Sequence, residues 1–212
     1  MSSTQAQLIV LGGLTGSGKS LVLEYLSSLS LPVIHLEELA GHRGSAFGRL
    51  GLTSLPASQP EFEFALSNIY HSHINSPFIF TESEAPSIGR IKIPAWFYQK
   101  MQEAVYIYIQ IPVEARIKNI LSIYDHVNEV ELITALYKLS ERMPEHKLET
   151  LEKMIKEKQL YDFIQAMLEY YDQSNKYTGI KEKASLVIDM PVFDVQKASD
   201  NILQFLSISE AA

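Results

Sequence analysis

The hydrophobic and polar positions of this chain follow two alternating patterns. Short apolar runs are typical of buried strands, and longer stretches with an apolar residue every three or four positions are typical of helices. We expect strands at 8–11, 32–36, 78–81, 105–111 and 186–190. We expect helices at 19–29, 58–73, 94–104, 113–124 and 194–206, and loops at 41–60 and 82–93. This alternation predicts an α/β fold, a three-layer sandwich with about five mostly parallel strands between helices.

One stretch towards the C-terminus departs from this alternation. Residues 126–178 have a helical pattern throughout, with breaks near 143–144 and near Asp172. The stretch is longer than one crossover between parallel strands needs. We therefore expect a single domain over residues 1–212, in which 126–178 form a lid-like helical insert that packs over the carboxyl edge of the sheet.

Composition and charge narrow the classes of site that the chain can contain. The 212 residues include no cysteine, which excludes from them a disulfide, a Cys-ligated zinc site, an iron–sulfur cluster and a cysteine nucleophile. The formal net charge of −7 does not favour non-specific nucleic-acid binding by the chain alone. No apolar run approaches the roughly 20 residues of a membrane span, and the N-terminus lacks the basic region of a signal peptide. We therefore expect a cytoplasmic protein.

A glycine-rich motif stands between the first expected strand and the first expected helix. Residues 13–20, Gly-Leu-Thr-Gly-Ser-Gly-Lys-Ser, match G-x-x-x-x-G-K-[ST], the Walker A loop of P-loop NTPases. Glycines let the backbone curl so that N–H groups point at phosphate oxygens, and the next helix adds its N-terminal dipole. We expect Lys19 to act on the outer phosphates as a catalytic cation and Ser20 to contact Mg²⁺. The predicted phosphate-binding residues of the loop are Gly13, Thr15, Gly16, Ser17, Gly18, Lys19 and Ser20.

Two glutamates follow the third expected strand. Glu82 and Glu84 lie on the same side of an extended chain, because alternate residues do. Magnesium is commonly held by one or two carboxylates together with phosphates and water. Either glutamate could bind a magnesium water or act as a base, and the alternative is a pair of solvated loop residues. We predict both as candidate catalytic residues and Glu82 as the metal residue.

Cationic side chains occur in loops after strands, where open α/β sheets bind their ligands. His42 and Arg43 follow the second strand, and Arg90 follows the third. Arg116 lies one turn into the helix after the fourth strand, a region that in many P-loop kinases begins a lid with phosphate-binding arginines. Arginine suits bidentate phosphate contacts. We predict these four residues as phosphate-binding candidates, with surface or packing roles as the alternative, and we expect Arg142 at the surface.

Taken together, these motifs resemble one family. The segments that carry the resemblance are 12–20, 42–48, 82–84, 88–90, 93–94, 170–172 and Tyr177. In order and spacing, over about residues 7–180, they are similar to the P-loop region of bacterial tRNA 2-selenouridine synthase. The Walker A loop is common to many families, whereas the run His-Arg-Gly-Ser-Ala-Phe-Gly at 42–48 is much more specific.

The resemblance implies an activity and its ligands. Enzymes of that family convert 2-thiouridine to 2-selenouridine at the wobble position of certain tRNAs through an S-geranyl intermediate, using geranyl diphosphate and selenophosphate. A rhodanese-type domain with an essential cysteine precedes their P-loop region. Because these 212 residues include no cysteine, either a separate rhodanese-type protein completes the reaction or the module acts differently here. The resemblance implies a site for ATP, GTP or geranyl diphosphate with Mg²⁺, while the acidic charge does not favour tRNA binding by this chain alone.

Two other functions stay open on the sequence alone. The length, the five expected strands and the lid-like insert also fit an ATP-dependent kinase for a nucleotide or another small molecule, with Glu82 or Glu84 as the base. A non-catalytic subunit that binds nucleotide and docks a rhodanese-type protein fits the same motifs. Phosphate transfer from ATP would identify the kinase, and co-purification with a rhodanese-type protein would support the subunit.

Overall fold

A five-stranded parallel sheet forms the centre of the protein in a computed structural model, which describes residues 6–52, 55–124, 126–173 and 181–210. The strands lie in the order β2-β3-β1-β6-β7. Their bounds are β1 Gln7–Gly12, β2 Val33–Ile34, β3 Phe78–Glu82, β6 Val105–Gln110 and β7 Leu186–Asp189, and a separate hairpin consists of β4 Ser87–Ile88 and β5 Ile91–Lys92. The helices are α1 Lys19–Ser28, α2 Leu36–Ala40, α3 Gln59–Ser72, α4 Ala95–Gln102, α5 Val113–Tyr124, α6 Glu129–Tyr137, α7 Glu145–Lys156, α8 Leu160–Asp172 and α9 Val195–Glu210.

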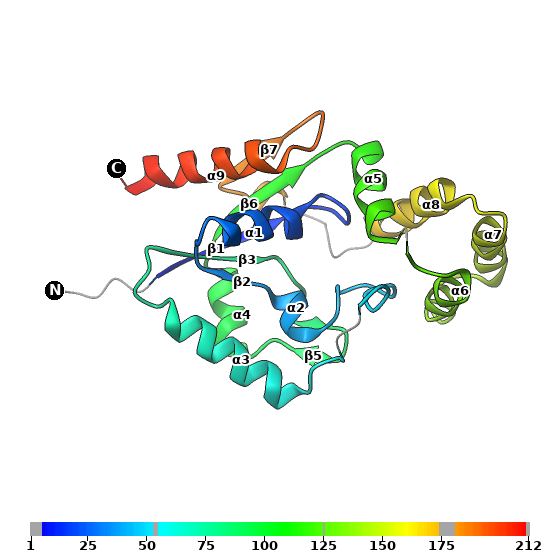
Figure 1. Cartoon of the computed structure of the whole chain (residues 1–212), viewed down its shortest axis with the longest axis horizontal. Coiled ribbons are helices and arrows are strands. Elements are labelled where there is room, and N and C mark those ends of the chain that lie inside the picture. Colours follow the sequence, from blue (N-terminus) through cyan, green and yellow to red (C-terminus); the bar gives the residue numbers. More distant parts are fainter. Residues whose placement is uncertain (1–5, 53–54, 125, 174–180, 211–212) are drawn as a thin grey trace.

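The side chains of β1 show why the sheet has helices on both faces. Leu8 and Val10 belong to a core with α3 and α4, whereas Ile9 and Leu11 belong to a core with α1 and α9. All four side chains are buried, and the two helical layers lie on opposite sides of the sheet (Figure 1). Apolar residues therefore run continuously along the strand, as they do in parallel sheets covered twice. The predicted three-layer α/β P-loop NTPase fold is confirmed.

Local sequence signals predicted the bounds of some elements correctly and missed those of others. The strand expected at 32–36 ends after two residues because α2 follows it, and the loop expected at 82–93 contains the β4–β5 hairpin. These elements are too short to show a hydrophobic period. The start of α3 is as expected, since Ser58 and Glu61 form a capping box in which each side chain accepts a hydrogen bond from the backbone of the other.

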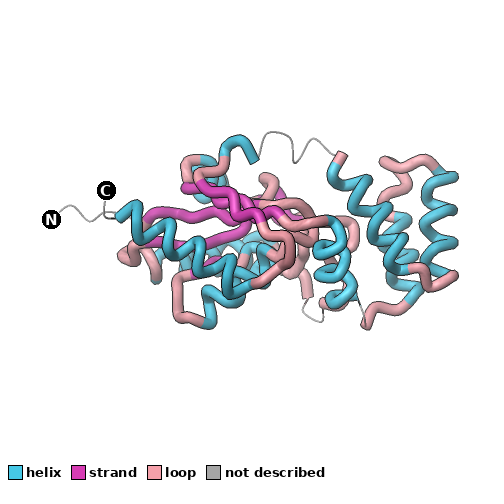
Figure 2. The backbone as a smooth tube through the Cα atoms, turned by 90° about the horizontal axis from the view of Figure 1, so that it is seen from above, coloured by secondary structure: helices cyan, strands magenta, loops and turns pink. Residues whose placement is uncertain are grey.

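Helices α6–α8, which we call the lid helices, lie together beyond the carboxyl ends of the strands (Figures 1 and 2). The helical pattern of 126–178 includes the expected break before α7, the expected end at Asp172 and a further break at 157–159. Residues 174–178, with Tyr177, lie outside the described part of the chain. No helix in the described ranges is both long and apolar enough to cross a membrane.

The lid helices have a hydrophobic core of their own, which also includes residues from two other segments. Ile117 and Ile120 of α5 belong to this core, as do Phe47 and Leu50 from the loop after α2. The ring of Phe47 packs edge-on against Phe163 of α8, with 5.8 Å between ring centroids. The loop after α2 therefore packs against the lid helices through Phe47 and Leu50, between its ends at α2 and α3.

Candidate functional site

The P-loop joins the end of β1 to the start of α1, and its shape depends on its glycines. Gly13, Gly16 and Gly18 have φ angles of 146°, 80° and 87°, in the left-handed region that other residues rarely adopt. A Cβ on Gly18 would also collide with the ring of Phe193, and one on Gly16 would lie 2.9 Å from the carbonyl oxygen of Arg116. The loop thus has the curled backbone that the Walker A motif predicts.

Lys19 and Ser20 open helix α1 beside this loop. The Nζ of Lys19 donates to the carbonyl oxygen of Gly13 at 2.8 Å and to that of Leu14 at 3.4 Å. Ser20 is exposed in the first turn. A helix N-terminus carries partial positive charge and N–H groups with no helical partner. The loop, Lys19 and the start of α1 together therefore favour an anion.

A cavity of about 1380 Å³ opens over the P-loop. It is bordered by the P-loop, the loop after α2, the end of β3 and the lid helices. The residues predicted from the sequence that line it are Gly13, Thr15, Gly16, Ser17, Gly18, Lys19, Ser20, His42, Arg43, Glu82 and Glu84. The fold thus brings most of the predicted residues to one place, and it leaves Arg90 and Arg116 outside the lining.

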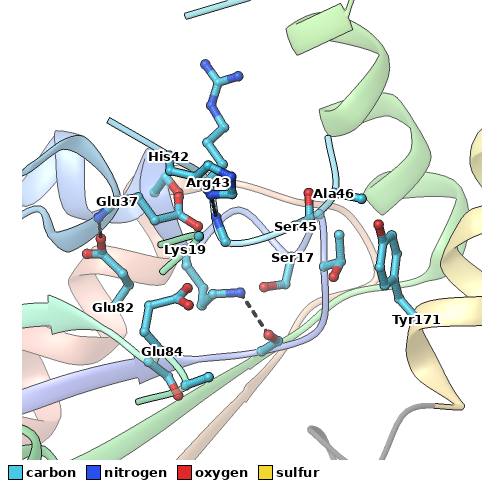
Figure 3. Close-up of a pocket in the computed structure, with 18 of the residues that line it drawn as sticks. Ser17, Lys19, Glu37, His42, Arg43, Ser45, Ala46, Glu82, Glu84 and Tyr171 are labelled. Atoms are coloured by element: carbon cyan, nitrogen blue, oxygen red, sulfur yellow. Dashed lines mark hydrogen bonds between the residues drawn. The ribbon is translucent and has the colours of Figure 1, made fainter. Parts of the chain in front are cut away.

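Glu82 is the last residue of β3 and lies beside the P-loop, because the sheet register pairs it with Leu11 of β1. Its Oε1 accepts a hydrogen bond from the N–H of Glu37 at 2.7 Å (Figure 3). Its Oε2 is buried and has no hydrogen-bond partner in the described part of the chain. Burial, with the nearby charges of Glu37 and Glu84, raises the pKa of Glu82 to about 8. The carboxyl group therefore has one oxygen available to a cation or a proton.

His42 is held between two glycines from different loops. Its Nδ1 accepts a hydrogen bond from the N–H of Gly44 at 3.0 Å, so the proton of the neutral ring lies on Nε2. A Cβ on Gly48 would lie 2.7 Å from the ring, and one on Gly89 would lie 2.9 Å from it. Burial and then the charge of Lys138 lower the pKa of His42. The ring therefore connects the loop after α2 to the β4–β5 hairpin.

The two loop arginines have different positions. Arg43 lines the cavity, and its Nη1 donates to the carbonyl oxygen of Leu50 at 2.8 Å, which holds the loop after α2 in shape. Arg90 is exposed at the turn of the β4–β5 hairpin and does not line the cavity. Both arginines stay predictions for phosphate contact: Arg43 lines the cavity, whereas Arg90 follows Gly89, the last hairpin residue that does.

Arg116 has a different environment from the one expected. It is only 4% exposed. Its Nη1 and Nη2 donate to the two carboxylate oxygens of Asp172 at 2.7 and 2.8 Å, and its Nε donates to the carbonyl oxygen of Thr15 at 2.8 Å. A direct phosphate contact would require it to leave a buried bidentate ion pair, which is costly. In this structure Arg116 therefore binds the P-loop backbone at Thr15, and its direct contact with phosphate stays a prediction.

The cavity also includes residues that the sequence-based reasoning did not select. They are Glu37, Ser45, Asn119, Lys138, Glu141, Tyr170 and Tyr171, together with Arg142, which was expected only at the surface. Tyr171 points towards Ser45 and Ala46 across the cavity wall (Figure 3). Its run with Tyr170 and Asp172 contributed to the family resemblance, which was the available signal for this part of the site.

Comparison with known proteins places these features in one family. A family model described as "tRNA 2-selenouridine synthase AAA domain" matches residues 6–189. The tRNA 2-selenouridine synthase of Nitrosomonas eutropha is 34% identical to this chain over 121 residues, which are 55% of this chain and 30% of the relative. The protein of the same name from Shewanella frigidimarina is 32% identical over 135 residues, which are 63% of this chain and 35% of the relative. The one from Sulfurovum sp. is 38% identical over 116 residues, which are 54% of this chain and 30% of the relative. The match spans about a third of each relative's length.

Solved structures of similar shape share little sequence with this chain. Shikimate kinase from Acinetobacter baumannii in complex with shikimate has 14% identity and a TM-score of 0.44, with coverage of 98% of this chain and 96% of that one. Similarity at this level indicates nothing about function, so the family of this chain is assigned from its sequence alone. The family model covers most of the chain, including the P-loop, the loop after α2 and the lid helices. The chain therefore belongs to the family of the tRNA 2-selenouridine synthase AAA domain.

Proposed function

We propose that this chain binds a diphosphate-bearing ligand together with Mg²⁺ and serves as the phosphate-binding module in the modification of a tRNA wobble uridine. The observation that carries this proposal is the meeting of the P-loop, Lys19 and Glu82 in one cavity. Together they supply backbone N–H groups, a cation and a carboxylate within one cavity. Diphosphate with a divalent cation needs this combination of groups.

The phosphate part of the ligand would lie against the P-loop and the start of α1. The N–H groups there and the helix dipole attract the oxygens of the diphosphate. The Nζ of Lys19, which contacts the Gly13 carbonyl oxygen at 2.8 Å, would turn to the outer phosphate. A charge-assisted hydrogen bond to phosphate is stronger than one to a neutral carbonyl group, which favours this exchange.

Ser20 and Glu82 would hold Mg²⁺. The Oε2 of Glu82 is a buried carboxylate oxygen with no hydrogen-bond partner among the described residues, and the Ser20 hydroxyl lines the same cavity. Magnesium takes oxygen ligands and usually keeps several waters and substrate phosphates, so few protein ligands suffice. When bound, the ion would offset charge on the phosphates. Its charge would also favour the ionised form of Glu82, which burial disfavours.

The rest of the ligand would extend towards the lid helices. The cavity, at about 1380 Å³, is larger than the roughly 300–1,000 Å³ of a typical small-molecule site. Its apolar and aromatic lining includes Ile120, which lies beside Gly16 of the P-loop, and Leu139, Tyr170 and Tyr171. These side chains would pack equally well on a nucleoside or on a geranyl chain, so ATP, GTP and geranyl diphosphate are the ligands to compare. The remaining space allows part of a second reactant to enter.

The tRNA substrate comes to the proposal from the names of the relatives. The cationic side chains of Lys138 and Arg142 line the cavity on the lid side, where they could contact an RNA backbone. The 212 residues include no cysteine, so we assign the cysteine-dependent step implied by the family resemblance to a rhodanese-type protein or domain outside this sequence.

Calorimetric titration of ATP, GTP and geranyl diphosphate, with and without MgCl₂, tests the proposal. We expect at least one ligand to bind more tightly with Mg²⁺ than without it. Lys19→Ala should lower the affinity for that ligand by about tenfold or more, because a charge-assisted contact is lost. Lys153→Ala, which removes an exposed cation from α7, is the matched control. Absence of binding by the wild type, or equal binding by Lys19→Ala, would contradict the proposal.

A kinase is the second candidate, because Glu84 as well as Glu82 lines the cavity that contains Lys19. A phosphoryl transferase needs a carboxylate that orients or deprotonates the acceptor hydroxyl near the transferred phosphate. Incubation with ATP and a panel of small-molecule hydroxyl acceptors distinguishes the two functions. A phosphorylated product that is lost in Glu84→Gln would establish the kinase in place of the modification module.

A further inference from the structure

Helix α5 holds the backbone of the P-loop through two side chains. The Nε of Arg116 donates to the carbonyl oxygen of Thr15 at 2.8 Å. One turn further along, the Nδ2 of Asn119 donates to the carbonyl oxygen of Gly16 at 3.0 Å. Two consecutive carbonyl groups of the phosphate-binding loop are thus fixed by one helix from a distant part of the sequence.

These contacts determine where the neighbouring N–H groups point. A peptide unit is planar and trans, so its C=O and N–H are directed to opposite sides. When the Thr15 carbonyl faces Arg116, the N–H of Gly16 faces away from Arg116. Gly16 lines the main cavity and Arg116 does not, although α5 reaches the cavity one turn later with Asn119 and Ile120, so the side away from Arg116 is the side of the cavity. The guanidinium group therefore acts on the phosphate site through one peptide bond.

The same guanidinium group also connects the loop to the lid helices. Its Nη1 and Nη2 donate to both carboxylate oxygens of Asp172, the last residue of α8, at 2.7 and 2.8 Å. Tyr171, the preceding residue, lines the cavity. Arginine presents its donors in a rigid plane, so one side chain can bind a carboxylate with one edge and a carbonyl with Nε. A lysine at this position has no such geometry.

We propose that Arg116 and Asn119 are positioning residues of the phosphate site. Arg116 holds the Thr15–Gly16 peptide so that the N–H of Gly16 faces the phosphate. Asn119 holds the next peptide, whose Ser17 N–H donates to the carbonyl oxygen of Leu14, and so fixes the other side of Gly16. The Asp172 pair makes this arrangement depend on the position of the lid helices. Neither side chain touches phosphate in this arrangement. The inference rests on the proposed function, because it concerns the same site.

The test is the affinity for pyrophosphate with Mg²⁺, which occupies the P-loop without a group that reaches the lid. We expect Arg116→Lys to weaken binding by about tenfold or more, and Asn119→Ala by about threefold, because a charged and a neutral hydrogen bond to the loop are lost. Lys118→Ala is the matched control, since it removes an exposed cation from the same helix and should leave the affinity unchanged.

Two further measurements separate positioning from a purely structural role. In ¹H–¹⁵N spectra, the Gly16 amide should shift strongly with pyrophosphate in the wild type and much less in Arg116→Lys, a variant that keeps a positive charge beside Asp172 but loses the Nε contact to Thr15. The exchange Arg116→Asp with Asp172→Arg restores opposite charges but places no guanidinium against Thr15. It should recover thermal stability relative to Arg116→Asp alone, without recovery of pyrophosphate affinity.

The outcomes distinguish this inference from the proposed function. If the wild type binds neither pyrophosphate nor ATP with Mg²⁺, the proposed function fails, and the inference fails with it. If the wild type binds and both Arg116→Lys and Asn119→Ala bind with unchanged affinity, only the inference is overturned. Recovery of affinity in the exchanged pair would also overturn it, because the ion pair alone would then be sufficient.

Discussion

Replacement of Glu82 by glutamine gives a direct test of the electrostatics of the site. Glu82 is 4% exposed, and burial with the charge of Glu37 raises its pKa from 4.5 to about 8. Glutamine keeps the shape of the side chain, and its oxygen can accept the same N–H of Glu37. It cannot ionise, so Glu82→Gln removes the titration and leaves the packing in place.

The magnitude and sign follow from the two pKa values. Between pH 4.5 and about 8 the folded protein keeps the Glu82 proton, which the unfolded chain has lost. The free energy of unfolding of the wild type therefore falls as pH rises, by about 1.4 kcal/mol per pH unit from this group alone. The total loss in the free energy of unfolding approaches about 5 kcal/mol at pH 8, and it increases little at higher pH. Glu82→Gln does not have this loss, so the difference in free energy of unfolding between Glu82→Gln and the wild type should increase steadily with pH, in favour of the variant.

Urea unfolding at pH 5, 6, 7 and 8, without Mg²⁺ and followed by the fluorescence of Trp96, measures this difference. Trp96 is the single tryptophan of the chain, so the signal has one source. Glu149→Gln, at an exposed position on α7, controls for the loss of one negative charge. A constant difference between wild type and Glu82→Gln across this range would refute the reasoning, because no proton would then be linked to folding.

Three further substitutions test the packing and the loop. Phe47→Ala should lower the free energy of unfolding by about 3–5 kcal/mol, because the ring is buried in the core of the lid helices; urea unfolding measures this. Gly18→Ala should lower both thermal stability and pyrophosphate affinity, because φ is 87° and its Cβ would collide with Phe193; a thermal-shift assay with and without ligand checks both. Ser58→Ala should destabilise the protein by about 1 kcal/mol through the α3 cap, and an unchanged melting temperature would contradict that role.

The strands and the P-loop could be predicted because their signals are local. The five strands of the sheet appear as apolar runs, since residues such as Ile9 and Val10 are buried on opposite faces of one strand. The Walker A motif fixes spacing over eight residues, and the fold places those residues as the motif requires. The position of Glu82 near the P-loop could be predicted for a similar reason, because the carboxyl ends of neighbouring parallel strands meet at one edge of the sheet.

The role of Arg116 could not be predicted, because it depends on contacts between distant residues. Thr15 precedes it by 101 positions and Asp172 follows it by 56, so no local pattern reports either bond. An arginine near phosphate-binding residues suggests direct contact with phosphate, whereas in the structure Arg116 is bound to the backbone of the loop and to Asp172. Phe47 is a similar case: within the specific run at 42–48, its side chain packs into the core of the lid helices.

Binding of pyrophosphate with Mg²⁺ to the wild type and to Lys19→Ala, measured by calorimetry under identical conditions, tests the central claim most directly. Pyrophosphate requires only the P-loop, Lys19 and the metal residues, so it does not depend on the identity of the organic group. The account predicts Mg²⁺-dependent binding by the wild type and an affinity at least about tenfold lower for Lys19→Ala. Equal affinity of the two proteins, or no binding by the wild type, would contradict it.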